Sequence, residues 1–252
     1  QNMVTIAKIG EGKGTSVAIP NLLTHEGSVF SLEIGGDTYR NTFNYRKIVM
    51  GQNVRVIDPF GVTGVLSDGI NLLAELKKVP PQYLEVHAAR FCACIYGDEL
   101  HEAVKSTGDN QIFTQTASQI TLAHILYLCT SPAVEDSDVN IAHLKRLLLN
   151  FGTGHPELDL SSRFKEDSGP YANRYQTAAA HLIGGKHIND NKTTYGIGFT
   201  IRSAFAFADS QLISSVSNES TFDLDELKKG KNTLTTTKTG RLCRLYQQIC
   251  IL

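Results

Sequence analysis

Short apolar runs and amphipathic segments alternate over the first 58 residues. Residues 4–7, 28–33 and 53–58 are short runs rich in β-branched and apolar side chains, which predicts three strands. Segments 15–23 and 38–50 lie between them and have apolar residues at helical spacing, which predicts two helices. Because strands and helices alternate, this part of the chain favours a parallel sheet whose strands bind ligands at their carboxyl ends.

From about Asn71 the pattern changes to sustained helical periodicity. Breaks rich in Gly, Pro and Asp separate the helical segments, and the longest loops are expected at 152–169 and 184–198. We interpret this region as an inserted all-α domain. Its predicted helices span 82–96, 111–129, 139–151 and 171–183.

After the helical region the chain returns to a mixed pattern. The sequence predicts a helix over 199–216, a strand over 232–236 and a terminal helix from Arg241. We therefore expect residues 1–75 and 196–252 to form one α/β domain, with residues 76–195 inserted as the all-α domain.

The composition is that of an ordinary globular protein, with a formal net charge of -1, 41% hydrophobic and 19% charged residues. None of the three blocks 1–75, 76–195 and 196–252 is strongly basic, so contact with nucleic acid requires a local surface or a ring of subunits. The five cysteines are odd in number and scattered, which favours reduced thiols in a cytosolic protein. No apolar run approaches the roughly 20 residues that span a bilayer, so we expect any membrane attachment to lie outside this chain.

A glycine-rich segment follows the first predicted strand and precedes the first predicted helix. In a phosphate-binding loop, backbone N–H groups surround the phosphate oxygens and a lysine reaches the β- and γ-phosphates. The sequence therefore predicts a nucleotide site for ATP with Mg²⁺, in which Lys13 stabilises phosphate charge and Thr15 binds the metal, with Ser16 at the metal or the α-phosphate. The predicted binding residues are Gly10, Glu11, Gly12, Lys13, Gly14, Thr15 and Ser16.

The match to the phosphate-loop pattern is incomplete. Ala7 stands where the pattern has its first glycine, and Gly14 stands where it has Ser or Thr. The alternative interpretation is a turn that only connects a strand to a helix, with Lys13 solvated.

Acidic residues end the second and third predicted strands. Glu33 and Asp58 are expected at the same edge of the sheet, beside the glycine-rich loop, where carboxylates hold Mg²⁺ or orient water. We assign Glu33 as a second catalytic candidate after Lys13. The alternative for both acids is a capping or turn role, and for Asp58, which precedes a proline, the two interpretations have equal weight.

Several segments in the same order resemble the type IV secretion and conjugation coupling proteins of the TraG/TraD kind, within the FtsK/HerA-like motor ATPases. The resemblance covers both ends of the chain and leaves the helical middle, where these proteins carry an all-α domain inserted in a RecA-like domain. The segments that carry it are Gly12–Ser16, Ile19–Leu23, Ser28–Asp37, Val56–Phe60, Gly69–Leu73, Phe222–Leu224 and Gly230–Leu234.

This resemblance implies a P-loop ATPase that forms a homo-hexamer at the cytoplasmic face of the bacterial inner membrane. Such a protein recruits relaxase or effector substrates to the type IV secretion apparatus and pumps single-stranded DNA toward its channel. The expected fold is a RecA-like α/β domain with the all-α insertion.

The chain also departs from the family pattern. Glu33 replaces an aspartate, Gly35 replaces a lysine, and no apolar strand ending in Asp-Glu, the Walker B motif, is present. Asp225 and Glu226 do not follow an apolar strand, and the Walker B region is expected after Leu252 or in residues missing near the run that begins at Thr235. A degenerate docking or scaffold module therefore remains the alternative function, and a small-molecule kinase is disfavoured because the helical insertion has no role in one.

Two further groups of residues have side chains suited to binding nucleic acid or phosphate. The aromatic stretch 199–207 has the residue types that stack on bases, but its apolar spacing favours a core role. Arg40, Arg46 and Lys47 are candidates for phosphate or subunit contacts, although arginines on exposed helices are usually only solvated.

Overall fold

The computed structural model describes residues 5–6, 8, 10–105, 109–181 and 192–237. The described chain divides into two compact units. The sheet unit contains the residues up to 70 together with residues 220–237, and the helical unit contains residues 71–219. Both ends of the described chain thus contribute to the sheet unit, and the helices lie between them in sequence.

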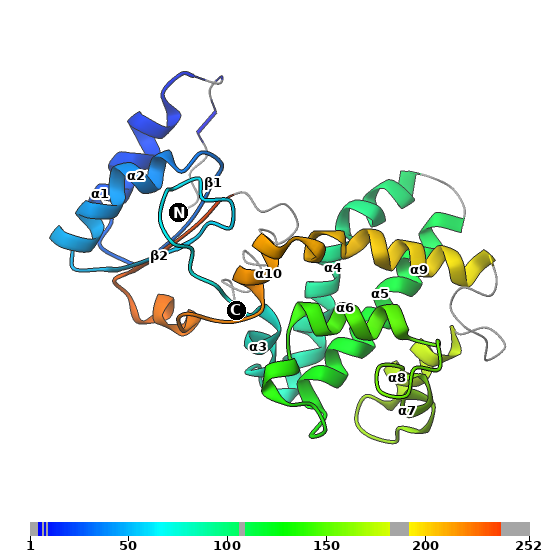
Figure 1. Ribbon diagram of the computed structural model, residues 1–252. Coiled ribbons are helices and arrows are strands. Elements are labelled where there is room, and N and C mark those ends of the chain that lie inside the picture. Colours follow the sequence, from blue (N-terminus) through cyan, green and yellow to red (C-terminus); the bar gives the residue numbers. More distant parts are fainter. Residues whose placement is uncertain (1–4, 7, 9, 106–108, 182–191, 238–252) are drawn as a thin grey trace. The chain divides into compact units, whose positions relative to one another are not determined.

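The sheet unit is built on a three-stranded parallel sheet with the order β1-β3-β2 (Figure 1). Its strands are β1 (Val29–Glu33), β2 (Asn53–Ile57) and β3 (Asn232–Thr237). All six residues of β3 are buried, because this strand has a neighbour on both sides. The threonines at 235–237 form the second half of β3.

Helical segments flank these strands along the chain. The π-helical turn η1 (Gly14–Ala18) leads into α1 (Ile19–Thr24), which packs against α2 (Asp37–Asn44). Helix α2 continues as the π-helical turn η2 (Tyr45–Val49), and together they form the crossover from β1 to β2, close to the helix predicted at 38–50. The 3-10 helix η6 (Leu224–Lys229) precedes β3.

The predicted first strand is not present among the residues that can be placed. Thr5 and Ile6 are exposed and have no strand conformation, whereas Val4 and Ala7 lie outside the described residues. A strand is stabilised by pairing with a neighbour, and neither of these two residues pairs with β1, β2 or β3. The predicted terminal helix from Arg241 also lies outside the described residues.

Arg46 is the largest fully buried side chain of the sheet unit. Its Nε donates to Thr233 Oγ1 at 2.6 Å, and its two terminal nitrogens donate to the carbonyl oxygens of His25 and Gly27, each at 3.1 Å, and of Leu22. Burial lowers the pKa of Arg46, but a guanidinium stays protonated at neutral pH. Arg46 is therefore not available for the phosphate or subunit contact for which it was a candidate, because the side chain is enclosed and each of its three nitrogens donates within its own unit.

Replacing Arg46 with Met should destabilise the sheet unit by at least about 3 kcal/mol, because several buried acceptors lose their donors. Hydrogen exchange of the β3 amides measures this change. The matched control is Lys47→Met on the same turn, an exposed lysine 5.3 Å from the centre of the Phe43 ring, which should cost at most about 1 kcal/mol. Equal losses in the two variants would contradict the role assigned to Arg46.

The helical unit is organised around α5, which packs against α4, α8, α9, α6 and α3. Ala117, Ala123, Ile125 and Leu126 of α5 are fully buried. No helix among the described residues has both the length and the apolar character needed to cross a membrane. The unit comprises α3 (Leu72–Lys77), α4 (Pro81–Lys105), α5 (Asp109–Thr130), η3 (Asp136–Asp138), α6 (Ile141–Asn150), α7 (Ser161–Glu166), α8 (Ala172–Ala180), α9 (Lys192–Ala204), η5 (Ala206–Asp209) and α10 (Gln211–Ser217).

The helical unit differs from the expected pattern near its end. The helix predicted over 199–216 is broken into α9, η5 and α10, since Phe205 turns into the core and Ser210 adopts an extended conformation before α10. Both α9 and α10 pack on α6, so they belong with the helical unit. The compact units therefore divide at residues 219 and 220, whereas the sequence pattern placed the division at 195 and 196.

The sequence pattern did not predict two short helices, α3 and α7. Helix α3 begins at Asn71, whose side-chain oxygen accepts from the N–H groups of Leu73 and Ala74, each at 3.2 Å. The Asn71 amide also donates to Val139 O at 2.7 Å, which joins this cap to the chain before α6. Helix α7 has only six residues, which is too short for periodicity to reveal.

A buried histidine lies in the core of the helical unit. His124 Nδ1 is 2.7 Å from Ile120 O on the preceding turn of α5, and its ring meets the rings of Phe151 and Phe164 edge-on. Its Nε2 is buried and has no hydrogen-bond partner among the residues that the structure describes. Burial in this aromatic setting lowers the pKa of His124 to about 4.

The pKa of His124 predicts a pH-dependent stability. Above pH 6.5 the histidine is neutral in both the folded and unfolded states. As the pH falls from 6.5 toward 4, only the unfolded state binds the proton, so the helical unit should lose about 3 kcal/mol. Urea unfolding monitored across this range measures the loss. His124→Phe should remove that component, and an unchanged pH profile in this variant would contradict the assignment.

Candidate functional site

The carboxyl edge of the sheet brings together residues from the two ends of the chain. Glu33 ends β1 and lies in register with Thr237 of β3, while Asp58 follows β2 directly. The Thr237 hydroxyl donates to Asp58 Oδ1 at 3.1 Å. The expectation that Glu33 and Asp58 share one sheet edge is therefore confirmed by the strand register.

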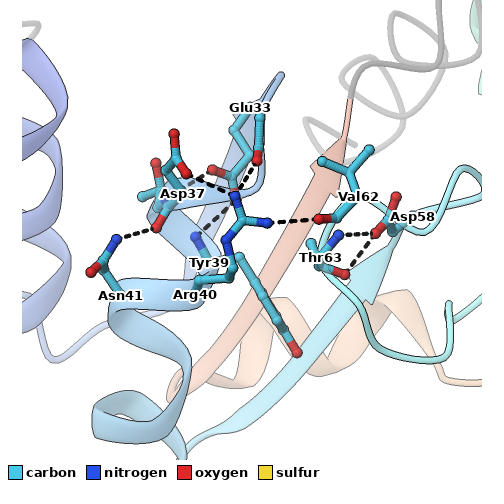
Figure 2. Close-up of polar contacts among 10 residues, drawn as sticks. Glu33, Asp37, Tyr39, Arg40, Asn41, Asp58, Val62 and Thr63 are labelled. Carbon is cyan, nitrogen blue, oxygen red and sulfur yellow. Dashed lines mark hydrogen bonds and ion pairs between the residues drawn. The ribbon is translucent and has the colours of Figure 1, made fainter.

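The Glu33 carboxylate caps the start of α2 (Figure 2). Its two oxygens accept from the backbone N–H groups of Thr38 at 2.8 Å and Tyr39 at 2.9 Å. Helix starts have unpaired N–H groups and a positive dipole end, so a carboxylate is well stabilised there. The structure thus shows Glu33 in the capping arrangement that the sequence analysis weighed against a catalytic one.

Asp58 is almost fully buried and organises the loop that follows β2. Its Oδ2 accepts from both the backbone N–H and the hydroxyl of Thr63, each at 2.6 Å, and its carbonyl accepts from Gly61 N at 3.2 Å (Figure 2). Burial acts to raise the pKa of Asp58, but the hydrogen bonds from Thr63, Val62 and Thr237 outweigh it and hold the pKa below its ordinary value. Asp58 is therefore a buried, ionised carboxylate at the edge of the sheet.

Arg40 joins the β1–α2 loop to the loop after β2. Its guanidinium donates to Val62 O and to Gly35 O, each at 2.7 Å, and to Asp37 Oδ1 at 2.8 Å (Figure 2). Nearby Tyr39 is buried, and burial together with the charges of Asp68 and Asp58 raises its pKa to about 12. The phenol therefore stays neutral at physiological pH and does not act as a base.

Gly36 allows this close approach of the two loops. It has a φ of 72°, which favours glycine, and a side chain there would lie 3.1 Å from Arg40 Nη1 and 3.3 Å from a Thr63 methyl carbon. Gly35 has no positive φ, and a side chain there would only approach Asp37 at 3.5 Å. The two adjacent glycines therefore have different structural requirements.

Gly36→Ala should destabilise the sheet unit by about 1–3 kcal/mol, since it adds backbone strain and crowds Arg40. Gly35→Ala is the matched control and should change the stability by less than about 1 kcal/mol. Urea denaturation of both variants measures the difference. An equal effect of the two substitutions would show that the conformation at Gly36 is not the cause.

The predicted phosphate loop forms a tight turn that opens directly into helical backbone. Gly10 and Gly12 have φ values of 85° and 78°, and the chain is helical from Gly14 onward. The Lys8 N–H donates to the Glu11 carboxylate at 2.9 Å, and the Glu11 N–H donates back to Lys8 O at 3.3 Å. Glycine is thus required at two positions for the backbone conformation of this loop.

The polar side chains of the loop bind its own backbone. Lys13 Nζ donates to Lys8 O at 2.7 Å, across the loop. The hydroxyls of Thr15 and Ser16 both donate to Gly12 O, at 3.0 Å and 2.6 Å. Thr15 and Ser16 are exposed, so their hydroxyl oxygens remain accessible to a ligand.

The hydrogen bonds described above for Thr15 and Ser16 stay within the loop, whereas those of Glu33 and Asp58 involve α2, β3 and the loop after β2. The described residues contain no group of three or more His, Cys, Asp or Glu side chains placed to hold a metal ion. The roles of Lys13 and Glu33 in catalysis and of Thr15 in metal binding stay predictions.

Comparison with known proteins shows the family of the chain. The model of the family described as "Type IV secretory system Conjugative DNA transfer" matches residues 1–236, which is most of the sequence. The chain belongs to the type IV conjugative DNA transfer family. The resemblance to conjugation coupling proteins is confirmed by this match, whereas a search of curated proteins finds no match.

Sequence reasoning missed the residues that order the carboxyl edge of this conjugative DNA transfer protein. Thr237 lies 179 residues from Asp58, and Arg40 lies 22 residues from Val62, so no local pattern marks these contacts. Thr63 is only five residues after Asp58, but it belongs to no recognised motif. One local signal in this region is the pair Gly35-Gly36, which is typical of a tight turn and lies between Glu33 and the start of α2.

Proposed function

We propose that this chain is the nucleotide-binding part of an ATP-driven coupling protein of conjugative DNA transfer, with a RecA-like α/β fold. The observation that carries the proposal is the loop at Gly10–Ser16, which turns through two positive-φ glycines and opens directly into helical backbone. A parallel sheet formed by both ends of the chain, with a helical unit between them in sequence, is compatible with this fold.

Three features of the loop support ATP binding. Ideal side-chain positions at Gly10 and Gly14 meet no atom within 4 Å, so the backbone on these sides is open to a ligand. Lys13 supplies positive charge for the β- and γ-phosphates, and its present bond to Lys8 O is exchanged for phosphate when the nucleotide binds. Thr15 or Ser16 would hold Mg²⁺, which neutralises phosphate charge when it is bound.

Glu33 would act as an acid near the nucleotide while it caps α2, because each of its oxygens accepts one backbone hydrogen bond and can accept a second. A ligand bound by these oxygens would therefore be linked to the start of α2. Asp58 is bound more tightly by Thr63 and Thr237, and we assign it a structural role.

The family supports a place in the conjugation apparatus. We propose that the chain works at the cytoplasmic face of the inner membrane as a homo-hexamer. There it recruits relaxase or effector proteins and helps drive nucleoprotein or single-stranded DNA into the type IV secretion channel.

The alternative is a docking or scaffold module of the same apparatus that has lost hydrolysis. Three observations favour it: Ala7 and Gly14 depart from the phosphate-loop pattern, and the carboxylate of Glu33 is used as a helix cap. In this case the helical unit recruits partners, and the loop is a relic of nucleotide binding.

Lys13→Ala should weaken binding of a fluorescent ATP analogue by at least about tenfold, because it removes the charge that faces the phosphates. Lys8→Ala is the matched control. The Lys8 backbone bonds to Lys13 and Glu11 do not depend on its side chain, so this variant should bind as the unchanged chain does. Equal affinity of the Lys13 variant and the unchanged chain would overturn the phosphate-loop assignment.

ATP turnover separates the two functions. Binding that depends on Lys13, accompanied by phosphate release, supports the coupling ATPase. Binding that depends on Lys13 without phosphate release, in a protein that extends through the region after Leu252, supports the docking module.

A further inference from the structure

Helix α9, labelled in Figure 1, carries aromatic residues that are exposed to solvent. Thr194, Ile197, Ile201 and Ala204 are buried and form one face of the helix. The opposite face is exposed, and a surface helix normally carries charged and polar residues there. On α9 this face instead includes Tyr195 at 54% and Phe199 at 60% exposure, together with Arg202.

The three residues lie on one line along the helix. Tyr195 and Phe199 are four residues apart and Arg202 follows three residues later, so at 3.6 residues per turn they share one face. The two aromatic residues are about 6 Å apart along the helix axis. This spacing is close to twice the roughly 3.4 Å between successive bases of one strand. We call Tyr195, Phe199 and Arg202 the α9 stripe.

The packing of α9 against α5 holds the stripe outward. A side chain at Gly196 would lie 2.7 Å from the ring of Phe113, so the backbone of α9 sits directly on this ring. Ile112, next to Phe113 in α5, is 58% exposed and extends the apolar surface beside the stripe. Because this packing fixes the backbone of α9, a ligand that stacks on the rings has only their side-chain torsions to order, which favours binding.

The charge of the stripe favours a polyanion. Arg202 forms no ion pair or hydrogen bond with any residue that the structure describes, so its guanidinium is available for a phosphate. The closest acid in sequence, Asp209, already binds Lys145. Because the chain is close to neutral overall, a local site of this kind is what nucleic-acid contact requires.

We propose that the α9 stripe is a stacking site for single-stranded DNA on the helical unit. The rings of Tyr195 and Phe199 stack on exposed bases, and Arg202 binds the phosphate backbone beside them. This inference deepens the proposed function and rests on it, since it names where the transported strand contacts the chain. It also corrects the expectation that the aromatic stretch 199–207 belongs to the core, which holds for Phe205 but not for Phe199.

The test is fluorescence anisotropy of a labelled oligothymidine strand titrated with the full chain. The double variant Tyr195→Ala/Phe199→Ala should bind at least about tenfold more weakly, because each base–ring contact is lost. Tyr195→Phe keeps the ring and should bind as the unchanged chain does. Leu212→Ala is the matched control, since Leu212 is an apolar side chain that is 53% exposed on α10, and the residues three and four positions after it, Ser215 and Val216, have no rings.

Two further measurements separate stacking from charge. Arg202→Gln should reduce the slope of log affinity against log salt by about 0.7, the value for one phosphate contact on a single strand. A strand of the same length without bases, and a duplex of the same sequence, should both bind more weakly than oligothymidine and should be insensitive to the double variant. If the double variant binds oligothymidine as the unchanged chain does, the stacking site is overturned.

Nucleotide binding distinguishes failure of this inference from failure of the proposed function. Variants of the α9 stripe should bind the ATP analogue normally, because the loop at Gly10–Ser16 belongs to the sheet unit. Normal ATP binding with unchanged DNA affinity overturns the stripe alone. If the double variant loses DNA affinity but the unchanged chain binds no ATP, the stripe is supported and the proposed ATPase function is overturned. Binding of a secretion protein that the double variant abolishes, with DNA affinity unchanged, assigns the stripe to protein docking and overturns the proposal.

Discussion

A buried guanidinium determines how the sheet unit is assembled. Arg46 takes a full positive charge into the interior, where no carboxylate among the described residues pairs with it. An unsolvated charge is very costly, so the backbone carbonyls of Leu22, His25 and Gly27 must converge on it. These carbonyls belong to α1 and to the segment between α1 and β1, and the Thr233 hydroxyl, which also accepts from Arg46, belongs to β3. One side chain thereby constrains the relative positions of segments from both ends of the chain.

That constraint extends to the opposite edge of the sheet. Gln52 supports the same cluster, because it donates to Glu26 O at 2.9 Å and accepts from the Thr233 hydroxyl at 2.8 Å. With β3 held between β1 and β2, the parallel register places Glu33, Thr237 and Asp58 together at the carboxyl edge. The positions of Glu33 and Asp58, the two acids that the sequence predicts near a nucleotide, therefore depend on Arg46 at the other end of the strands.

The carboxyl edge is highly ordered by its own hydrogen bonds. Glu33 is bound by α2, Asp58 by Thr63 and Thr237, and Arg40 connects the two loops. A ligand that competes with α2 for the Glu33 oxygens would therefore change the start of this helix. The proposed α9 stripe differs, because its two rings and its cation are exposed in the structure.

The sequence by itself determined the elements with strong local patterns. It predicted β1, β2 and β3, the crossover helix that α2 and η2 form, and the helical insertion, because periodicity and glycine stops are properties of neighbouring residues. It also identified the family from motifs in order. Only the tertiary structure decided that β3 lies between β1 and β2, that Arg46 is buried, that Glu33 caps a helix and that Phe199 faces solvent. Each of these features depends on contacts between segments that are distant in sequence. Such contacts, rather than the local sequence, determine which side chains are buried and which hydrogen-bond partners they have.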